Sequence, residues 1–381
     1  MSSRVVRNLA AGSAVLVTLC AAPGVAAAHR WHVDAAAVPP GSNPSALLRG
    51  VSCPSTSSCV AVGSFRSDTV PGAALVERWD GASWTIQNAP DPAGGSSSNL
   101  QGVSCASATA CEAVGYSFFA DGFRPFAERW DGTSWTAQSV PFPAGEEGSL
   151  QGVSCASAND CVAVGREDTS TGSNAFVVHW DGTSWAIQTA LGPPQTAELH
   201  GVSCSAATAC TAVGDAGATR EGGASATLAE RWDGTAWTIQ PSPSPAAVGD
   251  DELLGASCPS ATACTAVGFS SDDVSVTSGP LVERWDASGW TIQATPTVAD
   301  GAALNGVSCA SAKACTAVGA GNFALGEGWD GRSWTLQDVP VPAGATLSAL
   351  NGVSCTSANR CTAAGYYYDG STSLPLIERA S

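Results

Sequence analysis

The stretch GVSCPSTSSCVAVG, residues 50–63, decides the fold of this chain because close copies of it recur along the sequence. Its two cysteines, Cys53 and Cys59, stand six residues apart. Six further pairs keep this spacing: Cys105 and Cys111, Cys155 and Cys161, Cys204 and Cys210, Cys258 and Cys264, Cys309 and Cys315, Cys355 and Cys361. Successive first cysteines are 52, 50, 49, 54, 51 and 46 residues apart. Self-similarity at a period near 50 residues indicates a repeat architecture.

A second block follows each cysteine pair after a variable stretch. In the first unit it reads VERWDGASWTIQ, residues 76–87, with a tryptophan on each side of Asp80-Gly81. Asp-Gly between two apolar runs is a strong hairpin signal. The first unit is therefore predicted to hold four short strands, at Leu48–Cys53, Cys59–Phe65, Ala74–Trp79 and Trp84–Gln87.

Seven units of four antiparallel strands predict an all-β domain, a seven-bladed β-propeller over residues 29–381. The seventh unit stops at Glu378-Arg379, before its tryptophans, whereas Trp31 stands alone 22 residues before Cys53. In later units the second tryptophan lies 19 to 21 residues before the next first cysteine. We therefore expect the N-terminal strand at Trp31 to close the last blade. The alternative, an open solenoid, needs capping repeats, and neither end offers one.

The cysteine pairs predict local disulfides, because all cysteines after residue 28 fall into them and none is left over. Zinc is the alternative ligand for such pairs. However, no Cys-x-x-Cys spacing or clustered histidine accompanies them. The sequence thus predicts neither a metal nor a cofactor.

Residues 1–28 are typical of a signal peptide. Arg4 and Arg7 precede an apolar run, and Ala26 to Ala28 provide small residues for cleavage. We therefore expect a secreted, extracellular protein. Lipoprotein processing at Cys20 is the alternative, although Leu19 before it does not fit that signal. No later stretch predicts a transmembrane anchor.

The charge balance argues against nucleic acid as a partner. Asp and Glu number 33 against 16 Lys and Arg, which gives a formal net charge of −17. Such a surface repels phosphate backbones. We expect a monomer whose partner is a glycan or a protein.

A resemblance can now be named. The Asp-Gly-x-Ser-Trp turns, for example at Asp131, resemble the Asp-box of sialidase-type propellers, which has one more residue between Asp and Gly. From Trp31 to Arg379 the units are similar to the Cys-x5-Cys and Trp-Asp-Gly-x-Ser-Trp repeats of secreted bacterial β-propeller repeat proteins. The resemblance implies the architecture but no activity, because Asp-box turns serve enzymes and binding proteins alike.

The other repeated residues are interpreted as structural. The paired tryptophans suit packing between blades, and the turn aspartates suit backbone hydrogen bonds. Repetition argues that the arginine before the first tryptophan, such as Arg78, is also structural, paired with a neighbouring acid. In the fifth unit the turn glycine has moved, giving Asp286-Ala287-Ser288-Gly289.

No motif for chemistry emerges. Sialidase chemistry needs three converging arginines, a Tyr–Glu pair and an acid, and no motif joins arginines outside the repeat, such as Arg166 and Arg332, to a tyrosine. His200 stands alone, and the acidic run Asp250-Asp251-Glu252 is expected to be a solvated part of a linker. The leading hypothesis is a non-catalytic binding module. The alternatives are a glycoside hydrolase and a purely structural extracellular domain.

Recognition usually resides in variable loops on a rigid scaffold. In this propeller these are the connections between the second and third strands and the links between blades. The predicted ligand-binding residues are the least scaffold-like ones there: Phe118, Phe119, Phe123, Arg124, Arg166, Asp168, Tyr366, Tyr367, Tyr368 and Asp369.

Overall fold

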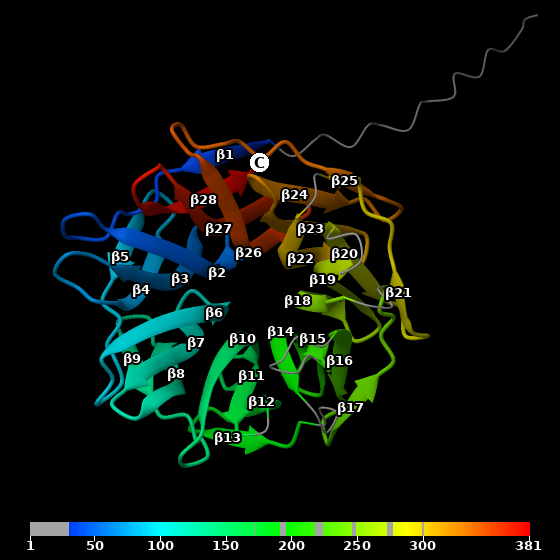
Figure 1. Cartoon of the computed structure of the whole chain (residues 1–381), viewed down its shortest axis with the longest axis horizontal. Helices are drawn as coiled ribbons and strands as arrows, with labels where there is room; N and C mark the ends of the chain where they lie inside the picture. The colour runs from blue at the N-terminus through cyan, green and yellow to red at the C-terminus, as the bar shows by residue number, and fades with distance from the viewer. Residues whose placement is uncertain are drawn as a thin grey trace, which may run out of the picture.

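The computed structural model describes residues 30–170, 172–190, 196–217, 224–245, 249–272, 277–298 and 301–381. The signal peptide predicted at residues 1–28 lies outside these ranges. Seven four-stranded antiparallel sheets stand around a central axis as the blades of a propeller (Figure 1). Among the described residues, no helix has the length and apolarity to span a bilayer.

Each blade runs from an inner strand at the axis to an outer strand at the rim. The inner strands are β2 (Ser45–Ser55), β6 (Ser97–Ser107), β10 (Glu147–Ser157), β14 (Ala197–Ala206), β18 (Asp251–Ser260), β22 (Ala303–Ser311) and β26 (Leu347–Ser357). The second strands are β3 (Ser58–Arg66), β7 (Ala110–Phe119), β11 (Asp160–Thr169), β15 (Ala209–Ala216), β19 (Ala263–Asp272), β23 (Ala314–Ala320) and β27 (Arg360–Tyr368). The third strands are β4 (Ala73–Trp79), β8 (Gly122–Trp130), β12 (Gly172–Trp180), β16 (Ala226–Trp232), β20 (Thr277–Trp285), β24 (Ala324–Trp329) and β28 (Ser373–Ala380). The outer strands are β5 (Trp84–Gln87), β9 (Trp135–Gln138), β13 (Trp185–Gln188), β17 (Trp237–Gln240), β21 (Trp290–Ile292), β25 (Trp334–Leu336) and β1 (Trp31–Asp34).

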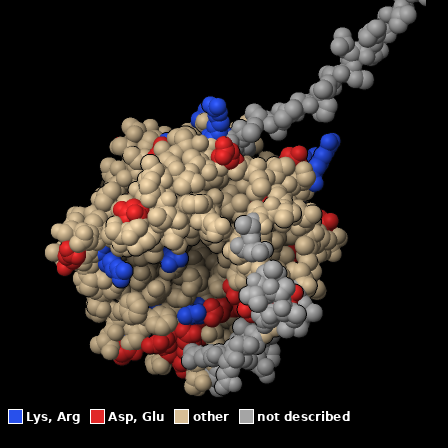
Figure 2. Space-filling view, turned by 45° about the horizontal axis from the view of Figure 1, so that its top comes forward, with Lys and Arg blue, Asp and Glu red and all other residues tan. Residues whose placement is uncertain are grey.

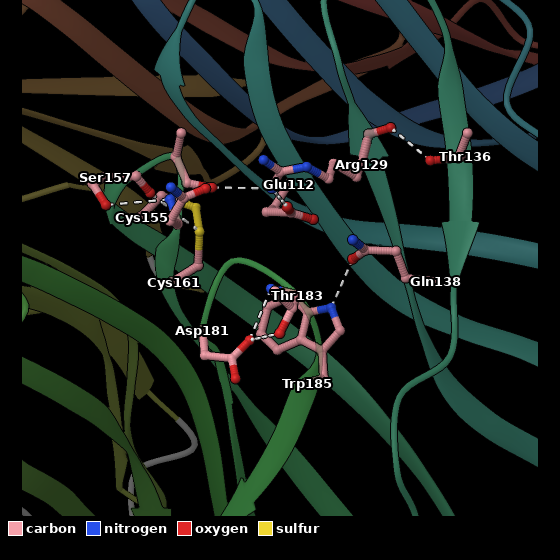
Figure 3. Close-up of polar contacts among 12 residues, drawn as sticks. Glu112, Arg129, Thr136, Gln138, Cys155, Ser157, Cys161, Asp181, Thr183 and Trp185 are labelled. Carbon is pink, nitrogen blue, oxygen red and sulfur yellow. Dashed lines mark hydrogen bonds and ion pairs between the residues drawn. A yellow bond between two sulfur atoms is a disulfide. The ribbon is translucent and has the colours of Figure 1, made fainter.

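The N-terminal strand closes the ring, as the sequence predicts. Strand β1 pairs antiparallel with β28, and Trp31 faces Ala380. The Trp31 indole Nε1 donates to Gln337 Oε1 of blade 6 at 2.7 Å. Trp185 makes the equivalent bond to Gln138 of the preceding blade at 2.7 Å (Figure 3). Trp31 therefore occupies the position of the outer-strand tryptophan that the seventh unit lacks, and it makes the same hydrogen bond to the preceding blade.

The inner strands are held together by the repeated Gly-Val-Ser-Cys motif. A Cβ added to Gly50 would lie 3.3 Å from the backbone of Gly102 in the next blade, so the close approach needs glycine. Two residues later, the Ser52 hydroxyl accepts a hydrogen bond from the backbone N–H of Cys105 at 3.0 Å. The same bond recurs at every blade interface, ending with Cys53 donating to Ser354. Together these contacts form a closed ring around the axis.

All seven predicted disulfides are present, each within one blade. They join the inner strand to the second strand at the end of their hairpin. Cys105 and Cys111 face each other across this hairpin, with Cα atoms 4.0 Å apart. Each bridge ties the second strand to the strand that carries the inter-blade hydrogen bond.

The repeated arginine stacks on a tryptophan of the next blade. The Arg129 guanidinium carbon lies 5.2 Å from the ring centroid of Trp180. Arg129 also pairs with the buried Glu112, in line with the acid partner expected from the sequence (Figure 3). The stack recurs at Arg78, Arg231, Arg284 and Arg379. Cation–π contacts between blades thus supplement the inner ring.

A glutamate one position before this arginine is fully buried in six blades: Glu77, Glu128, Glu230, Glu283, Glu327 and Glu378. Glu77 Oε2 accepts from the backbone N–H of Ala37 at 2.8 Å, in the link that enters its blade. Burial raises the pKa of Glu378 to about 8. Burial, followed by the negative charge of Asp91, raises the pKa of Glu128 to about 8. A raised pKa of this kind favours the neutral carboxyl group, which is less costly to bury than the carboxylate.

The Asp-Gly turns of the third hairpins are closed by their aspartates. Asp131 Oδ1 accepts from the backbone N–H groups of Thr133 and Ser134 at 2.7 and 2.9 Å, and Gly132 has φ = 98°. In the fifth blade the glycine position is taken by Ala287, with φ = 72°. The turn therefore keeps its left-handed geometry although its glycine has moved.

Ala287→Gly should stabilise the protein by about 1 kcal/mol, because an L-residue pays a steric penalty in this conformation. Chemical unfolding against the parent protein measures the change. Gly289→Ala is the control, since no atom lies within 4 Å of the added Cβ and its φ is not left-handed. A destabilised Ala287→Gly variant would contradict the assignment of strain.

Trp31→Ala should destabilise the protein by about 3–5 kcal/mol, because it removes a buried aromatic side chain from the joint of the ring. Thermal and urea unfolding of both proteins provide the measurement. Val33→Ala is the matched control on the same strand, because Val33 is 43% exposed. Equal effects of the two substitutions would show that β1 does not hold the ring closed.

Stability should be greatest near pH 4–5 and should fall on both sides. The buried glutamates have raised pKa values in the folded state. Their contribution to the free energy of unfolding is therefore complete below the ordinary pKa of 4.5 and is lost as the pH rises to about 8. The turn aspartates act in the opposite direction. Hydrogen bonds from the Thr133 hydroxyl and the Ser134 backbone lower the pKa of Asp131 to about 2, so its contribution is lost in acid.

A series of melting temperatures from pH 3 to pH 9 tests this prediction. Glu378→Gln should reduce the loss of stability on the alkaline side, because it removes one group whose folded pKa is raised. The exposed Asp338→Asn should leave the profile unchanged. A profile that rises steadily towards pH 8 would contradict the expectation.

Candidate functional site

The topology gives the propeller two unlike faces. One carries the disulfide-closed first turns and the Asp-Gly third turns, and we call it the turn face. The other carries the connections between second and third strands and the links between blades, and we call it the variable face. Inner strands begin, and second strands end, on the variable face. Figure 2 shows the molecule hollowed near its centre, with acidic and basic side chains around the hollow.

All ten predicted ligand-binding residues lie at the variable face. They stand at the ends of β7, β11 and β27, at the start of β8, and directly after β27. The structure brings the members from the second unit together. It places those from the seventh unit apart from them, with blade 1 between, and no ring contact joins the two groups within the described residues.

In blade 2, aromatic side chains cover the hairpin of β7 and β8. Tyr116 lies 5.6 Å, centroid to centroid, from both Phe118 and Phe123. Phe119 follows Phe118 in β7, and the guanidinium carbon of Arg124 lies 5.3 Å from the centroid of its ring. Arg124 in turn forms an ion pair with Asp121. The hairpin thus presents aromatic surface whose positions are fixed by neighbouring rings and one arginine.

Beside this hairpin lies a cleft of about 400 Å³. Phe119 and Arg124 form one wall, and the links into and out of blade 2 form the others. Its lining is mostly apolar: Pro92, Ala93, Phe119, Pro125, Phe126, Ala137, Val140 and Phe142, with Arg124, Gln138 and Ser139 as the polar members. The sequence indicated only that the links between blades vary. The walls that these links form were therefore not predicted, whereas Phe119 and Arg124 were.

The seventh-unit residues have local partners. Asp369 Oδ1 accepts from the backbone N–H groups of Ser371 and Thr372, both at 2.8 Å. It therefore closes an Asp-Gly turn of its own, on the variable face. Tyr367 packs against the core of blade 7 and is half-buried. Tyr366 and Tyr368 are also half-buried.

One pair of facing positions in each blade lies near the mouth of the central channel. One member is the inner-strand residue just before the buried leucine. The other is the second-strand residue just after the glycine, and it faces the first across the two strands. We call these two residues the rim pair. The seven rim pairs are Leu47 and Ser64, Asn99 and Tyr116, Ser149 and Arg166, Glu198 and Asp215, Glu252 and Phe269, Ala303 and Ala320, Ala349 and Tyr366. Charged members occur only in blades 3 to 5.

These charged rim residues contact one another across blades. Arg166 Nη1 of blade 3 lies 3.1 and 3.0 Å from the two carboxylate oxygens of Glu198 in blade 4. Arg166 Nε also lies 3.4 Å from Asp168, and Asp168 accepts from the Ser173 hydroxyl. The predicted residues Arg166 and Asp168 therefore belong to one polar network.

A second cluster joins blades 4 and 5. His200 Nε2 lies 2.8 Å from Asp215 Oδ1, and a Glu252 oxygen lies within 4.8 Å of both partners. Burial acts to lower the pKa of His200, but the hydrogen bond and charge of Asp215 prevail and raise it. Burial and then the charge of Asp215 raise the pKa of Glu252 to about 7. The cluster thus joins one histidine and two carboxylates from two neighbouring blades.

Sequence reasoning missed this cluster. His200 was interpreted as an isolated residue, and the run at Asp250 was placed in a solvated linker. In the structure, Asp251 and Glu252 belong to strand β18, and Asp251 is fully buried. The three residues come from three strands, so only the position of each in its repeat could have indicated that they meet.

Three of the arginines outside the repeat, Arg166, Arg332 and Arg360, are divided between the two faces. Arg332 lies in an Asp-Gly turn and Arg360 at a first turn, both on the turn face. Arg166 lies on the opposite face, where Glu198 and Asp168 neutralise it. These three arginines cannot converge on one carboxylate.

No protein-family model and no curated protein matches this chain. Solved propellers are similar in fold. A structure described as YCF48 bound to D1 peptide has a TM-score of 0.54 at 13% identity, covering 92% of this chain and 94% of that one. The WD40 propeller domain of Doa1 has a TM-score of 0.55 at 10% identity, covering 92% and 97%. The GH74 xyloglucanase from Xanthomonas campestris has a TM-score of 0.53 at 12% identity, covering 90% of this chain and 54% of the enzyme. At these identities the likeness establishes the β-propeller fold.

Proposed function

We propose that this protein is a secreted, non-catalytic binding propeller that holds a polypeptide segment on its variable face. The observation that carries the proposal is the apolar cleft of blade 2, which lies on the same face of the molecule as the charged rim pairs of blades 3 to 5. Phe119 lines this cleft, whereas Phe118 points to the other side of the same blade and contacts Tyr116 of the rim.

The contrast between the two faces supports recognition on this side. On the turn face the first hairpins are closed by disulfides and the third turns by an aspartate, followed by glycine except at Ala287 of blade 5. On the variable face the connections differ in length and content from blade to blade. Variation on a rigid scaffold is where binding residues are usually found.

The chemistry of the cleft favours a peptide over a sugar. Its walls are proline, alanine, valine and phenylalanine side chains, with few polar groups. A sugar ring presents hydroxyl groups that need several hydrogen-bonding partners when they are buried. An apolar peptide side chain needs only shape and contact area. The charged rim then remains for polar groups of the same segment.

Two further observations support the remaining parts of the proposal. Seven disulfides are typical of proteins that mature in an oxidising compartment outside the cytosol. The aspartate-closed turns support the kinship with Asp-box propellers. We retain the expectation of a monomer that does not bind nucleic acid. The YCF48 structure, described as bound to a peptide, supports the suitability of this fold for such a ligand.

Peptides selected from a random displayed library against the exported protein should share an aromatic or aliphatic anchor residue. Phe119→Ala should weaken their binding by roughly thirtyfold, as expected for the loss of a central anchor contact of about 2 kcal/mol. Fluorescence anisotropy with a labelled peptide measures the affinity. Phe323→Ala is the matched control, because Phe323 is an exposed phenylalanine in the β23–β24 connection on the same face.

Three outcomes would contradict the proposal. One is equal loss of affinity in both variants. Another is saturable binding on a glycan array without any selected peptide, which would favour a lectin. The third is release of reducing ends from a glycan panel, which would favour the glycoside hydrolase alternative. Tyr367→Ala, examined with the same peptide, tests whether the predicted residues of blade 7 take part.

A further inference from the structure

We propose that His200, Asp215 and Glu252 bind a first-row divalent cation of the Zn²⁺ type at the interface of blades 4 and 5. His200 and Asp215 come from β14 and β15, and Glu252 comes from β18 of the next blade. This inference goes beyond the proposed function, because it concerns a different part of the rim from the cleft of blade 2.

The geometry provides three ligand atoms around one point. The His200 ring nitrogen and one oxygen from each carboxylate all lie within 4.8 Å of one another. A cation of this class binds nitrogen and oxygen ligands at about 2.0–2.2 Å. The Glu252 carboxylate makes no hydrogen bond within the described residues, so its oxygens are available as metal ligands.

The scaffold does not explain these residues. Positions equivalent to His200 hold Arg49, Gln101, Gln151, Leu254, Asn305 and Asn351. Rim positions in blades 1, 2, 3, 6 and 7 hold apolar or uncharged side chains, apart from Arg166 of blade 3. The other blades therefore close around the axis without a histidine or a carboxylate pair. The combination at blades 4 and 5 is an addition to the repeat.

The charges at the cluster favour a cation. Asp250 and Glu198 are further carboxylates whose charges act on Glu252, and Arg166 contacts both oxygens of Glu198. Asp215 and Glu252 both have a carboxylate oxygen close to the His200 ring nitrogen. Two carboxylates this close repel each other when both are ionised. A divalent cation removes the repulsion and links two blades at the same time.

The donor set selects the class of metal. Imidazole with carboxylates suits Zn²⁺ and its neighbours in the first transition row. Ca²⁺ prefers six to eight oxygen ligands and does not favour a nitrogen. Three protein ligands leave at least one coordination position open, as in zinc sites that bind water or a further donor.

The test uses the exported full-length protein after dialysis against a chelator. Isothermal titration with ZnCl₂ should show one saturable site per chain, and titration with CaCl₂ should show much weaker binding. His200→Ala and Glu252→Gln should each weaken Zn²⁺ binding by more than about tenfold, in proteins whose circular dichroism matches that of the parent.

His179→Ala is the matched control. His179 Nε2 lies 3.5 Å from Asp160 Oδ1, so it forms a similar histidine–aspartate pair, and it belongs to none of the three-ligand groups found among the described residues. Its loss should leave the Zn²⁺ affinity unchanged. The proposal is overturned if the parent protein shows no saturable Zn²⁺ binding, if Ca²⁺ binds more tightly than Zn²⁺, or if His179→Ala and His200→Ala have equal effects. None of these results depends on whether a peptide binds to blade 2.

Discussion

One hydrogen bond, repeated at each blade interface, sets the geometry of this molecule. The backbone N–H of the first cysteine in a blade donates to a serine hydroxyl of the preceding blade, as Cys105 does to Ser52. It can form only because glycines such as Gly50 and Gly102 let the inner strands approach without a Cβ between them. The bond therefore holds neighbouring blades at one spacing, and a closed ring of the seven units requires the last serine to meet the first cysteine. The meeting of Ser354 with Cys53 satisfies that requirement.

Interactions farther from the axis depend on this ring. Each disulfide ties a second strand to the inner strand that carries the bond, and the arginine–tryptophan stacks then join the third strands of successive blades. Of the two interfaces without the stack, the one after blade 3 replaces the arginine alone, by His179, and the one after blade 6 replaces both partners. In blade 6, Gly328 stands in the arginine position, and in blade 7 Ala380 stands where its tryptophan partner would be. Both members of a stacking pair are thus replaced together, at the joint that β1 completes.

Because the turn face is occupied by structural contacts, the variable face is left to differ between blades. The rim pairs make this division visible at the level of single residues. Ala303 and Ala320 satisfy the fold in blade 6, whereas Glu198 and Asp215 occupy the same positions in blade 4. The scaffold tolerates either pair because the inner ring and the disulfides already hold the strands. The charged groups at the rim are therefore not required by the fold, whereas the buried glutamates, which recur in six blades, belong to the packing of the blades.

The sequence alone determined the repeat, the strands, the disulfides and the closure by Trp31, because each depends on local spacing or on a periodic signal. Its second-strand endings also indicated Phe119 and Arg166 correctly as residues of the variable face. Only the tertiary structure showed that Arg166 meets Glu198, and that His200 meets Asp215 and Glu252. These contacts join residues of different strands and mostly of different blades, and side chains brought together by ring closure leave no spacing signal in the chain. For the seventh-unit tyrosines, the closed ring expected from the sequence already placed blade 1 between them and Phe119, whereas the packing of Tyr367 against the core of blade 7 was visible only in the structure.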